Sequence, residues 1–207
     1  RIKDPRRKAQ WMARQHHDFQ REGNPVGYYV PGMDANIAGG NTLMLNHKNL
    51  KNSEISEKTL LDDTIIEVTW EGEVVWEWRC SDHFSEFGFG EDARNAMYRN
   101  PNVVTGGVGD WLHLNSMSAL GPNSWYDSGD TRFHPENVIW SSRQANIIAI
   151  IEKSTGKIVW KLGPDYHASK QWNLGWIIGP HSAHMIPSGL SGEGNILIFD
   201  NGGRAGY

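Results

Sequence analysis

The chain has 207 residues, ten of them Trp and 23 of them Gly, and a formal net charge of −4. This length suffices for a sizeable core in one or two domains, and no apolar run approaches the roughly 18 residues of a membrane helix, so we expect no membrane span. Because the charge is small and mixed, with no basic stripe through an aromatic-rich stretch, we also expect no nucleic-acid partner.

The predicted elements are mostly short strands. Abundant Gly and Trp favour strands joined by tight turns, with aromatic side chains between the sheets. Two segments, residues 4–15 and 56–63, predict a turn or two of helix each. The single cysteine, Cys80, can form neither an intramolecular disulfide nor, alone, a zinc site. The sequence therefore predicts an all-β protein.

A strand pattern recurs three times along the chain. Each copy begins with Asn, continues through four mostly apolar residues and has a polar side chain six positions after that Asn. The copies are "NTLMLNH" at 41–47, "NVIWSSR" at 137–143 and "NILIFDN" at 195–201. Their sixth positions are occupied by His47, Arg143 and Asn201. Such repetition indicates one structural unit used several times.

A hairpin pattern follows the first two of these strands, over residues 64–78 and 146–162. Each hairpin consists of a β-rich run, a Gly-containing turn and a second run that reaches a tryptophan, Trp76 or Trp160. We expect both tryptophans to pack between sheets rather than to bind a ligand.

A histidine-bearing segment precedes each Asn-led strand. The three segments are "QHHDF" with His17, "WLHLNSM" with His113 and "GPHSAHM" with His181. A complete unit is then a His-bearing strand, an Asn-led strand and a hairpin, which is the four-stranded arrangement of a β-propeller blade. The innermost strands of successive blades line a central channel, so we expect the three histidines to converge there.

The blade-like units cover about 15–78 and 111–162, with an incomplete one from 179. Residues 1–207 are therefore expected to form a partial β-propeller domain of two to three blades. A propeller needs at least about four blades to close. We expect the remaining blades to lie in further sequence or to come from elsewhere, including other copies in a homo-oligomer.

The channel residues suit an anionic ligand. Besides the three histidines they include Asn115 beside His113, and Arg143 at the end of the next strand. Arginine offers a planar fork of donors to sulfate or phosphate oxygens, and asparagine adds a neutral donor. One neutral imidazole can act as a covalent nucleophile while another moves a proton near neutral pH.

Several other interpretations remain open at this point. The histidines are also compatible with a structural role in the strands, or with a metal site of a lyase or hydrolase made by all three. A non-catalytic propeller that binds an anionic ligand or a protein fits the same residues, and Arg143 also suits a salt bridge at a blade edge. The "TGKIVW" turn alone suggests a quinoprotein dehydrogenase, which leaves the histidines unexplained.

The remaining histidines fall into two groups. Three of them lie in polar, loop-like contexts and are predicted to be surface residues: His16, His134 and His167. His83 and His184 receive no assignment.

The motifs "HHDF", "DWLHLNSM", "NVIWSSR", "TGKIVWKLG" and "PHSAHMIPSG…GNILIFDNG" occur in this order between about residues 16 and 203. In this the chain resembles the arylsulfate sulfotransferases that do not depend on the sulfonucleotide PAPS. The resemblance implies a six-bladed β-propeller with its site in the central channel. It also implies sulfuryl transfer from an aryl sulfate to a phenol through a sulfohistidine, with no cofactor, in a periplasmic or extracellular protein.

The resemblance also implies roles for individual residues. His181 matches the nucleophilic histidine of the family, although Pro180 stands where the family often has Gln. His113 and Asn115 match its H-x-N pair, and His113 or His17 would carry the proton. Arg143 matches the family's sulfate-binding arginine, which would hold the sulfuryl oxygens together with Asn115, and His17 matches the remaining channel histidine.

Overall fold

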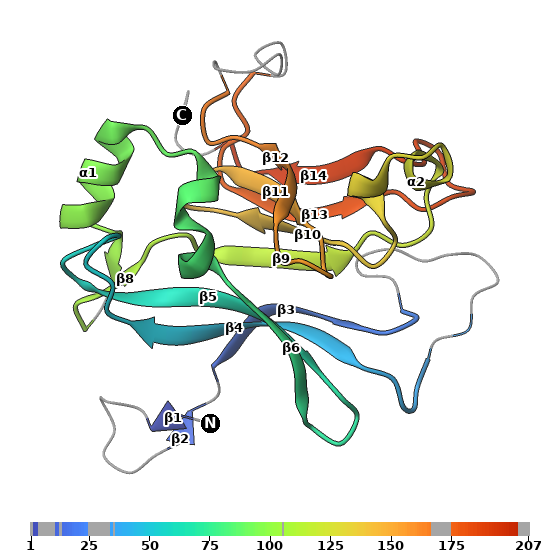
Figure 1. Ribbon diagram of the computed structural model, residues 1–207, viewed down its shortest axis with the longest axis horizontal. Helices are drawn as coiled ribbons and strands as arrows, with labels where there is room; N and C mark the ends of the chain where they lie inside the picture. The colour runs from blue at the N-terminus through green and yellow to red at the C-terminus, as the bar shows by residue number, and fades with distance from the viewer. Residues whose placement is uncertain are drawn as a thin grey trace.

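The computed structural model describes residues 2–3, 11–12, 14–24, 34, 36–104, 106–166 and 175–202 (Figure 1). The strands are β1 (Ile2–Lys3), β2 (Trp11–Met12), β3 (Gln15–Arg21), β4 (Thr42–Leu50), β5 (Thr59–Val68), β6 (Val74–Arg79), β7 (Val103–Val104), β8 (Val108–Asp110), β9 (Leu114–Ala119), β10 (Val138–Ser142), β11 (Ile147–Ile151), β12 (Ile158–Leu162), β13 (Pro180–Met185) and β14 (Ile196–Asp200). The helices are α1 (Glu91–Arg99), α2 (Ser124–Asp127) and the 3-10 helices η1 (Cys80–Phe87) and η2 (Thr131–Phe133). Strands dominate this part of the chain, which confirms the all-β class.

The first sheet contains β3, β4, β5 and β6 as successive antiparallel neighbours. β8 pairs in parallel with the start of β5, and β7 pairs with β8, so the sheet has six strands. The predicted hairpin at 64–78 is confirmed as β5 and β6. Its turn includes Gly72, whose φ of 93° is a conformation that side-chain-bearing residues rarely adopt.

The second sheet has four strands in the order β12-β11-β10-β9, all antiparallel. Its β11–β12 hairpin confirms the hairpin predicted at 146–162, with Gly156 in the turn at a φ of 76°. A third, two-stranded sheet pairs β13 with β14. One hydrophobic core joins the second sheet to the first and another joins it to the third, so the second sheet lies between them.

Two hydrophobic cores lie on the two faces of the second sheet. β11 shows this division, because its side chains alternate: Ile147, Ala149 and Ile151 belong to the core shared with the first sheet, and Ile148 and Ile150 to the core shared with β13 and β14. Burial of both faces explains why β11 and the first three residues of β10 are apolar without alternation.

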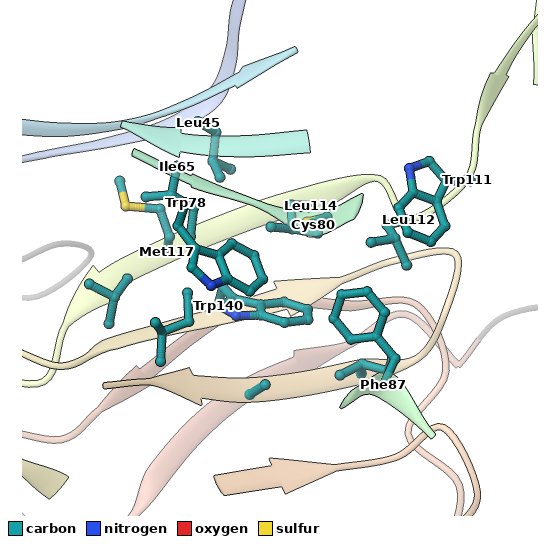
Figure 2. Close-up of a cluster of buried hydrophobic side chains, with 14 of the residues drawn as sticks. Leu45, Ile65, Trp78, Cys80, Phe87, Trp111, Leu112, Leu114, Met117 and Trp140 are labelled. Carbon is teal, nitrogen blue, oxygen red and sulfur yellow. The ribbon is translucent and has the colours of Figure 1, made fainter. Parts of the chain in front are cut away.

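Aromatic residues fill the first core (Figure 2). Trp78 of β6 and Trp140 of β10 lie 5.8 Å apart between ring centroids, and Phe87 of η1 packs edge-on against Trp140 at 5.9 Å. The indole Nε1 of Trp76 donates to the Lys153 carbonyl at 3.1 Å, which fixes the first sheet to the second. Trp76 packs against the first core and Trp160 against the second, so the expectation that both are packing residues is confirmed.

The structure corrects the expected helices. Residues 59–63 of the predicted helix at 56–63 belong to β5, because Leu60 enters the core and the backbone pairs with β4. The predicted helix at 4–15 falls mostly outside the described residues, and within it Trp11–Met12 is a strand. The described strands form open sheets that stack in succession, not a closed ring.

Candidate active site

The three histidine-bearing strands lie side by side and run in one direction. Two side chains of β3 accept hydrogen bonds from the backbone of β9: Asp18 Oδ2 from Met117 N at 3.1 Å, and Gln20 Oε1 from Ala119 N at 2.6 Å. On the other side of β9, Ser116 Oγ accepts from Ala183 N of β13 at 3.1 Å. The starts of these strands, where the predicted histidines occur, therefore lie at one end of the assembly.

His17 and His113 are in direct contact. Their rings meet edge to face, with centroids 4.8 Å apart and planes at 74°. Both residues have left-handed backbone, with φ of 51° and 54°, which is costly for a residue other than Gly. The left-handed residue His113 immediately precedes β9, which begins at Leu114.

A carboxylate orients His113. Asp110 Oδ2 lies 2.6 Å from His113 Nδ1. A carboxylate only accepts, so Nδ1 carries the proton and Nε2 remains available. Burial alone would raise the pKa of Asp110, but the hydrogen bond and charge of His113 outweigh it and hold that pKa below its ordinary value. Sequence reasoning missed Asp110, although it lies three residues before His113.

The protonation of His181 is set by the backbone. His181 Nδ1 lies 2.8 Å from the carbonyl oxygen of Gly179 and 3.1 Å from Asn201 Nδ2. Because a carbonyl oxygen only accepts, the shorter contact assigns the proton to Nδ1, and the Asn201 amide fits this tautomer with its oxygen, not its nitrogen, turned towards Nδ1. The neutral imidazole then has its lone pair on Nε2, which is the atom a nucleophilic histidine uses.

Asn115 links β9 to the residue before His181. Its Nδ2 donates to the Pro180 carbonyl at 3.0 Å, and its Oδ1 accepts from Ser141 Oγ at 2.8 Å. The side chain is buried. An amide nitrogen has two N–H groups, and one of them makes the contact with Pro180. Asn115 is thus a positioning residue for the His181 segment as well as a candidate donor.

Arg143 lies beside the same segment. Its backbone N donates to the His113 carbonyl at 3.1 Å, and its side chain is exposed. A Cβ added to Gly179 would lie 3.8 Å from the Cγ of Arg143. Gly179 also has a φ of 62°, so glycine suits this position on both counts. The aliphatic part of the Arg143 side chain therefore lies next to Gly179, whose carbonyl accepts the hydrogen bond of His181 Nδ1.

Electrostatic coupling joins the three predicted histidines. Burial is the main cause that lowers the pKa of His17, and the positive charges of His113, His47 and His181 lower it further. His181 therefore lies within electrostatic reach of the His17–His113 pair. The structure brings His17, His113 and His181 to one end of the three strands β3, β9 and β13, with Asn115 and the aliphatic part of the Arg143 side chain beside them.

The other histidines differ from expectation in part. The prediction that His16 is a surface residue is wrong: its side chain is 13% exposed, because its ring stacks on His47 at 3.6 Å. His134 is half-buried, His83 stacks on Trp78, and His184 is buried. The prediction for the histidine at position 167 lies outside the described residues.

Metal-ligand spacing occurs in the described residues, but not at the three predicted histidines. His16, His47 and Asp63 offer ligand atoms within 4.8 Å of one another. Sequence reasoning missed this group, although the adjacent acidic residues "DD" at 62–63 within an apolar strand were a signal.

A cavity of about 760 Å³ lies at the other end of strands β3, β9 and β13. Its lining includes Arg21 at the end of β3 and Asn24 beyond it, Ala119 at the end of β9, and Pro187 after β13. Because the candidate catalytic histidines lie at the opposite strand ends, this cavity receives no part in the chemistry.

Comparison with known proteins gives one family. The family model described as arylsulfotransferase (ASST) matches residues 34–207. No curated protein and no solved structure gives a significant match. The matched range contains His113, Asn115, Arg143 and His181, whereas His17 precedes it and is connected to the site by its contact with His113. Among the described residues, none of the helices is long and apolar enough to cross a membrane.

Proposed function

The chain belongs to the arylsulfotransferase family, and we propose that it transfers a sulfuryl group from an aryl sulfate to a phenol through a sulfohistidine at His181. Family membership gives the general class, a sulfotransferase with aryl sulfate and phenol substrates. The observation that carries the residue assignment is the tautomer of His181, whose Nδ1–H···O contact with Gly179 leaves Nε2 as the nucleophile.

In the first half-reaction, His181 Nε2 attacks the sulfur of the donor. The new N–S bond forms as the bond between sulfur and the phenolic oxygen breaks, and the electron pair of that bond leaves with the oxygen. The Nδ1 proton stays on the imidazole and remains hydrogen-bonded to the Gly179 carbonyl, so the ring keeps its orientation during the attack. A covalent intermediate divides one difficult transfer into two easier ones.

The departing phenoxide needs a proton, and His113 is the better carrier. Asp110 stabilises the imidazolium form of His113 through the 2.6 Å contact. His17 is held neutral by burial and by the neighbouring positive charges, which lower its pKa. In the second half-reaction neutral His113 accepts the proton of the acceptor phenol, whose oxygen attacks the sulfur and releases His181.

Arg143 and Asn115 would hold the sulfuryl oxygens. A guanidinium fork matches two oxygens at once, and the second N–H of the Asn115 amide adds a neutral donor. Fixed donors directed at developing charge usually provide the largest part of rate acceleration. The cycle balances without a nucleotide or redox cofactor, because the sulfuryl group passes from the donor to the acceptor, the acceptor's proton replaces the one given to the departing phenoxide, and His181 is restored.

We propose further that the three sheets are successive blades of a six-bladed propeller, with units at 15–78, 111–162 and from 179. Three features support this: the stacking order of the sheets, the direct contacts of β9 with β3 and β13, and the two cores between neighbouring sheets. The channel histidines would then face the axis of the ring.

Steady-state kinetics with two substrates test the proposed function. With p-nitrophenyl sulfate as donor and an unsubstituted phenol as acceptor, ping-pong transfer predicts parallel double-reciprocal lines. Mixing the enzyme with donor alone should release one equivalent of p-nitrophenol per site. Binding of the donor without release of p-nitrophenol would instead favour a non-catalytic, anion-binding propeller.

A further inference from the structure

A second cluster of polar groups lies beside the channel histidines, across three neighbouring strands. Asp63 of β5 is the register partner of His47 on β4, and its Oδ1 lies 3.1 Å from His47 Nε2. The same oxygen lies 3.3 Å from Nε2 of His16 on β3. The two imidazole rings stack at 3.6 Å between centroids with their planes 16° apart, so joint ligation of one ion in both ring planes requires the rings to turn apart.

Hydrogen bonding supports this cluster only weakly. Within the described part of the chain, His16 Nε2, His47 Nε2 and both carboxylate oxygens of Asp63 are buried and meet no partner at full hydrogen-bond geometry. Asp63 is fully buried, and the groups that favour its charge are His47 and the backbone of Leu114. Burial of a carboxylate is costly unless donors or a cation compensate it.

The distances suit a metal ion. A tetrahedral Zn²⁺ with bonds of about 2.0–2.1 Å places neighbouring ligand atoms about 3.4 Å apart. The observed N–O distances are 3.3 Å and 3.1 Å. The three ligand atoms all lie within 4.8 Å of one another. The His16 and His47 side chains are 13% and 17% exposed, so part of each ring reaches the surface although both Nε2 atoms are buried.

We propose that His16 Nε2, His47 Nε2 and Asp63 Oδ1 bind one divalent transition-metal ion, with Zn²⁺ as the first candidate. Two imidazoles and one carboxylate are a donor set that zinc and its neighbours in the first transition row accept readily. The ion would compensate the buried charge of Asp63 and fasten β3 to β4 and β5.

The same ion would influence the channel histidines through His16, which contacts His17. A neutral imidazole that ligates a metal with Nε2 must carry its proton on Nδ1. His16 Nδ1 lies 2.9 Å from His17 Nδ1 and would donate to it. His17 would then keep its own proton on Nε2. The metal thus fixes the tautomer of His17 without touching substrate, so the site is distinct from the proposed sulfuryl-transfer chemistry.

Metal binding is tested on the protein itself, without reference to activity. After removal of metals with a chelator, the protein is titrated with ZnCl₂ by calorimetry, and the metal content after dialysis is measured by mass spectrometry. We expect one Zn²⁺ per chain. His47→Ala and Asp63→Asn should each weaken binding by at least about 100-fold, since changes even in residues behind the ligands cost 10- to 100-fold.

Two histidine variants serve as controls. His134→Ala removes a half-buried histidine remote from the cluster, and His113→Ala removes a channel histidine; both should keep the site. Loss of binding in His113→Ala but not in His47→Ala would overturn the proposal in favour of a channel metal site. Absence of stoichiometric Zn²⁺ from the wild type, or unchanged affinity in His47→Ala, would also overturn it. If circular dichroism shows that Asp63→Asn does not fold, the metal affinity of His47→Ala, which replaces a partly exposed side chain, tests the proposal instead.

Discussion

The ring of His17 lies edge-on against the ring of His113, with centroids 4.8 Å apart, in residues separated by a whole sheet in the sequence. Two imidazoles this close do not both hold a positive charge readily. Asp110 Oδ2 lies 2.6 Å from Nδ1 of His113 and can pair with an imidazolium there. These contacts support the roles we propose for the pair, with His113 as proton carrier and His17 as its neutral neighbour.

Replacement of Asp110 by Asn should reduce turnover while leaving donor binding largely intact. An amide can donate to His113 Nδ1, which moves the imidazole proton to Nε2 and makes that atom unavailable as a base. We expect kcat to fall by about 10²-fold or more, and KM for the aryl sulfate to stay within about threefold. Steady-state kinetics of both proteins provide the measurement, and a wild-type kcat in Asp110→Asn would contradict the role assigned to Asp110.

Asp110 should also contribute to stability in a pH-dependent way. Its pKa in the folded protein lies below the ordinary value of 3.8, because His113 outweighs the opposing effect of burial. The contribution is fully present above about pH 4 and is lost as the pH falls through the folded pKa. The difference in unfolding free energy between wild type and Asp110→Asn should therefore shrink on acidification. Urea unfolding at several pH values measures it, and a difference that grows towards low pH would refute the sign.

Arg143 should be sensitive to the geometry of its side chain, not only to its charge. A lysine keeps the positive charge but loses the planar fork. We expect Arg143→Lys to lower kcat/KM for the donor by about 10²-fold and Arg143→Ala by more, since the sulfuryl oxygens would lose two donors. The matched control is Arg132→Ala, because that exposed arginine pairs with Asp130 away from the site. Equal loss in the control would remove the argument for Arg143.

The aromatic core should dominate the stability of the junction between the first two sheets. Trp140 is completely buried and packs against Trp78 and Phe87 (Figure 2). Trp140→Ala should lower the unfolding free energy by about 3–5 kcal/mol. Val75→Ala, at a position that is 53% exposed, should change it by no more than about 0.5 kcal/mol. Denaturant unfolding distinguishes the two, and similar effects would show that the sheets are held together in another way.

Much of the strand pattern is readable from sequence because it depends on local chemistry. The Gly-containing turns fix the β5–β6 and β11–β12 hairpins, and both occur where the pattern predicts them. The helical prediction at 56–63 failed because pairing with β4 and burial of Leu60 override a weak local preference. Helix α1 was missed since all of its residues are exposed or half-buried, so it lacks the apolar stripe that periodicity detects.

The candidate site was predictable only in part, for a geometric reason. Equivalent positions in a repeat bring His17 and His113 to the same end of neighbouring strands, and the structure confirms their contact. The contacts of Asp110, His16 and Asp63 depend on strand register and on left-handed residues such as His17, which no periodicity reveals. The roles of residues that act through such contacts could therefore be assigned only from the three-dimensional structure.

The central claim is that His181 carries the sulfuryl group between donor and acceptor. The most direct measurement is intact-protein and peptide mass spectrometry after the enzyme is mixed with an aryl sulfate and no acceptor, under conditions that preserve the acid-labile N–S bond. We predict one sulfuryl adduct on the peptide containing His181, which disappears when a phenol is added. His181→Ala should show no adduct and lose activity by at least about 10³-fold. An active wild type without the adduct, or a fully active His181→Ala variant, would contradict the account.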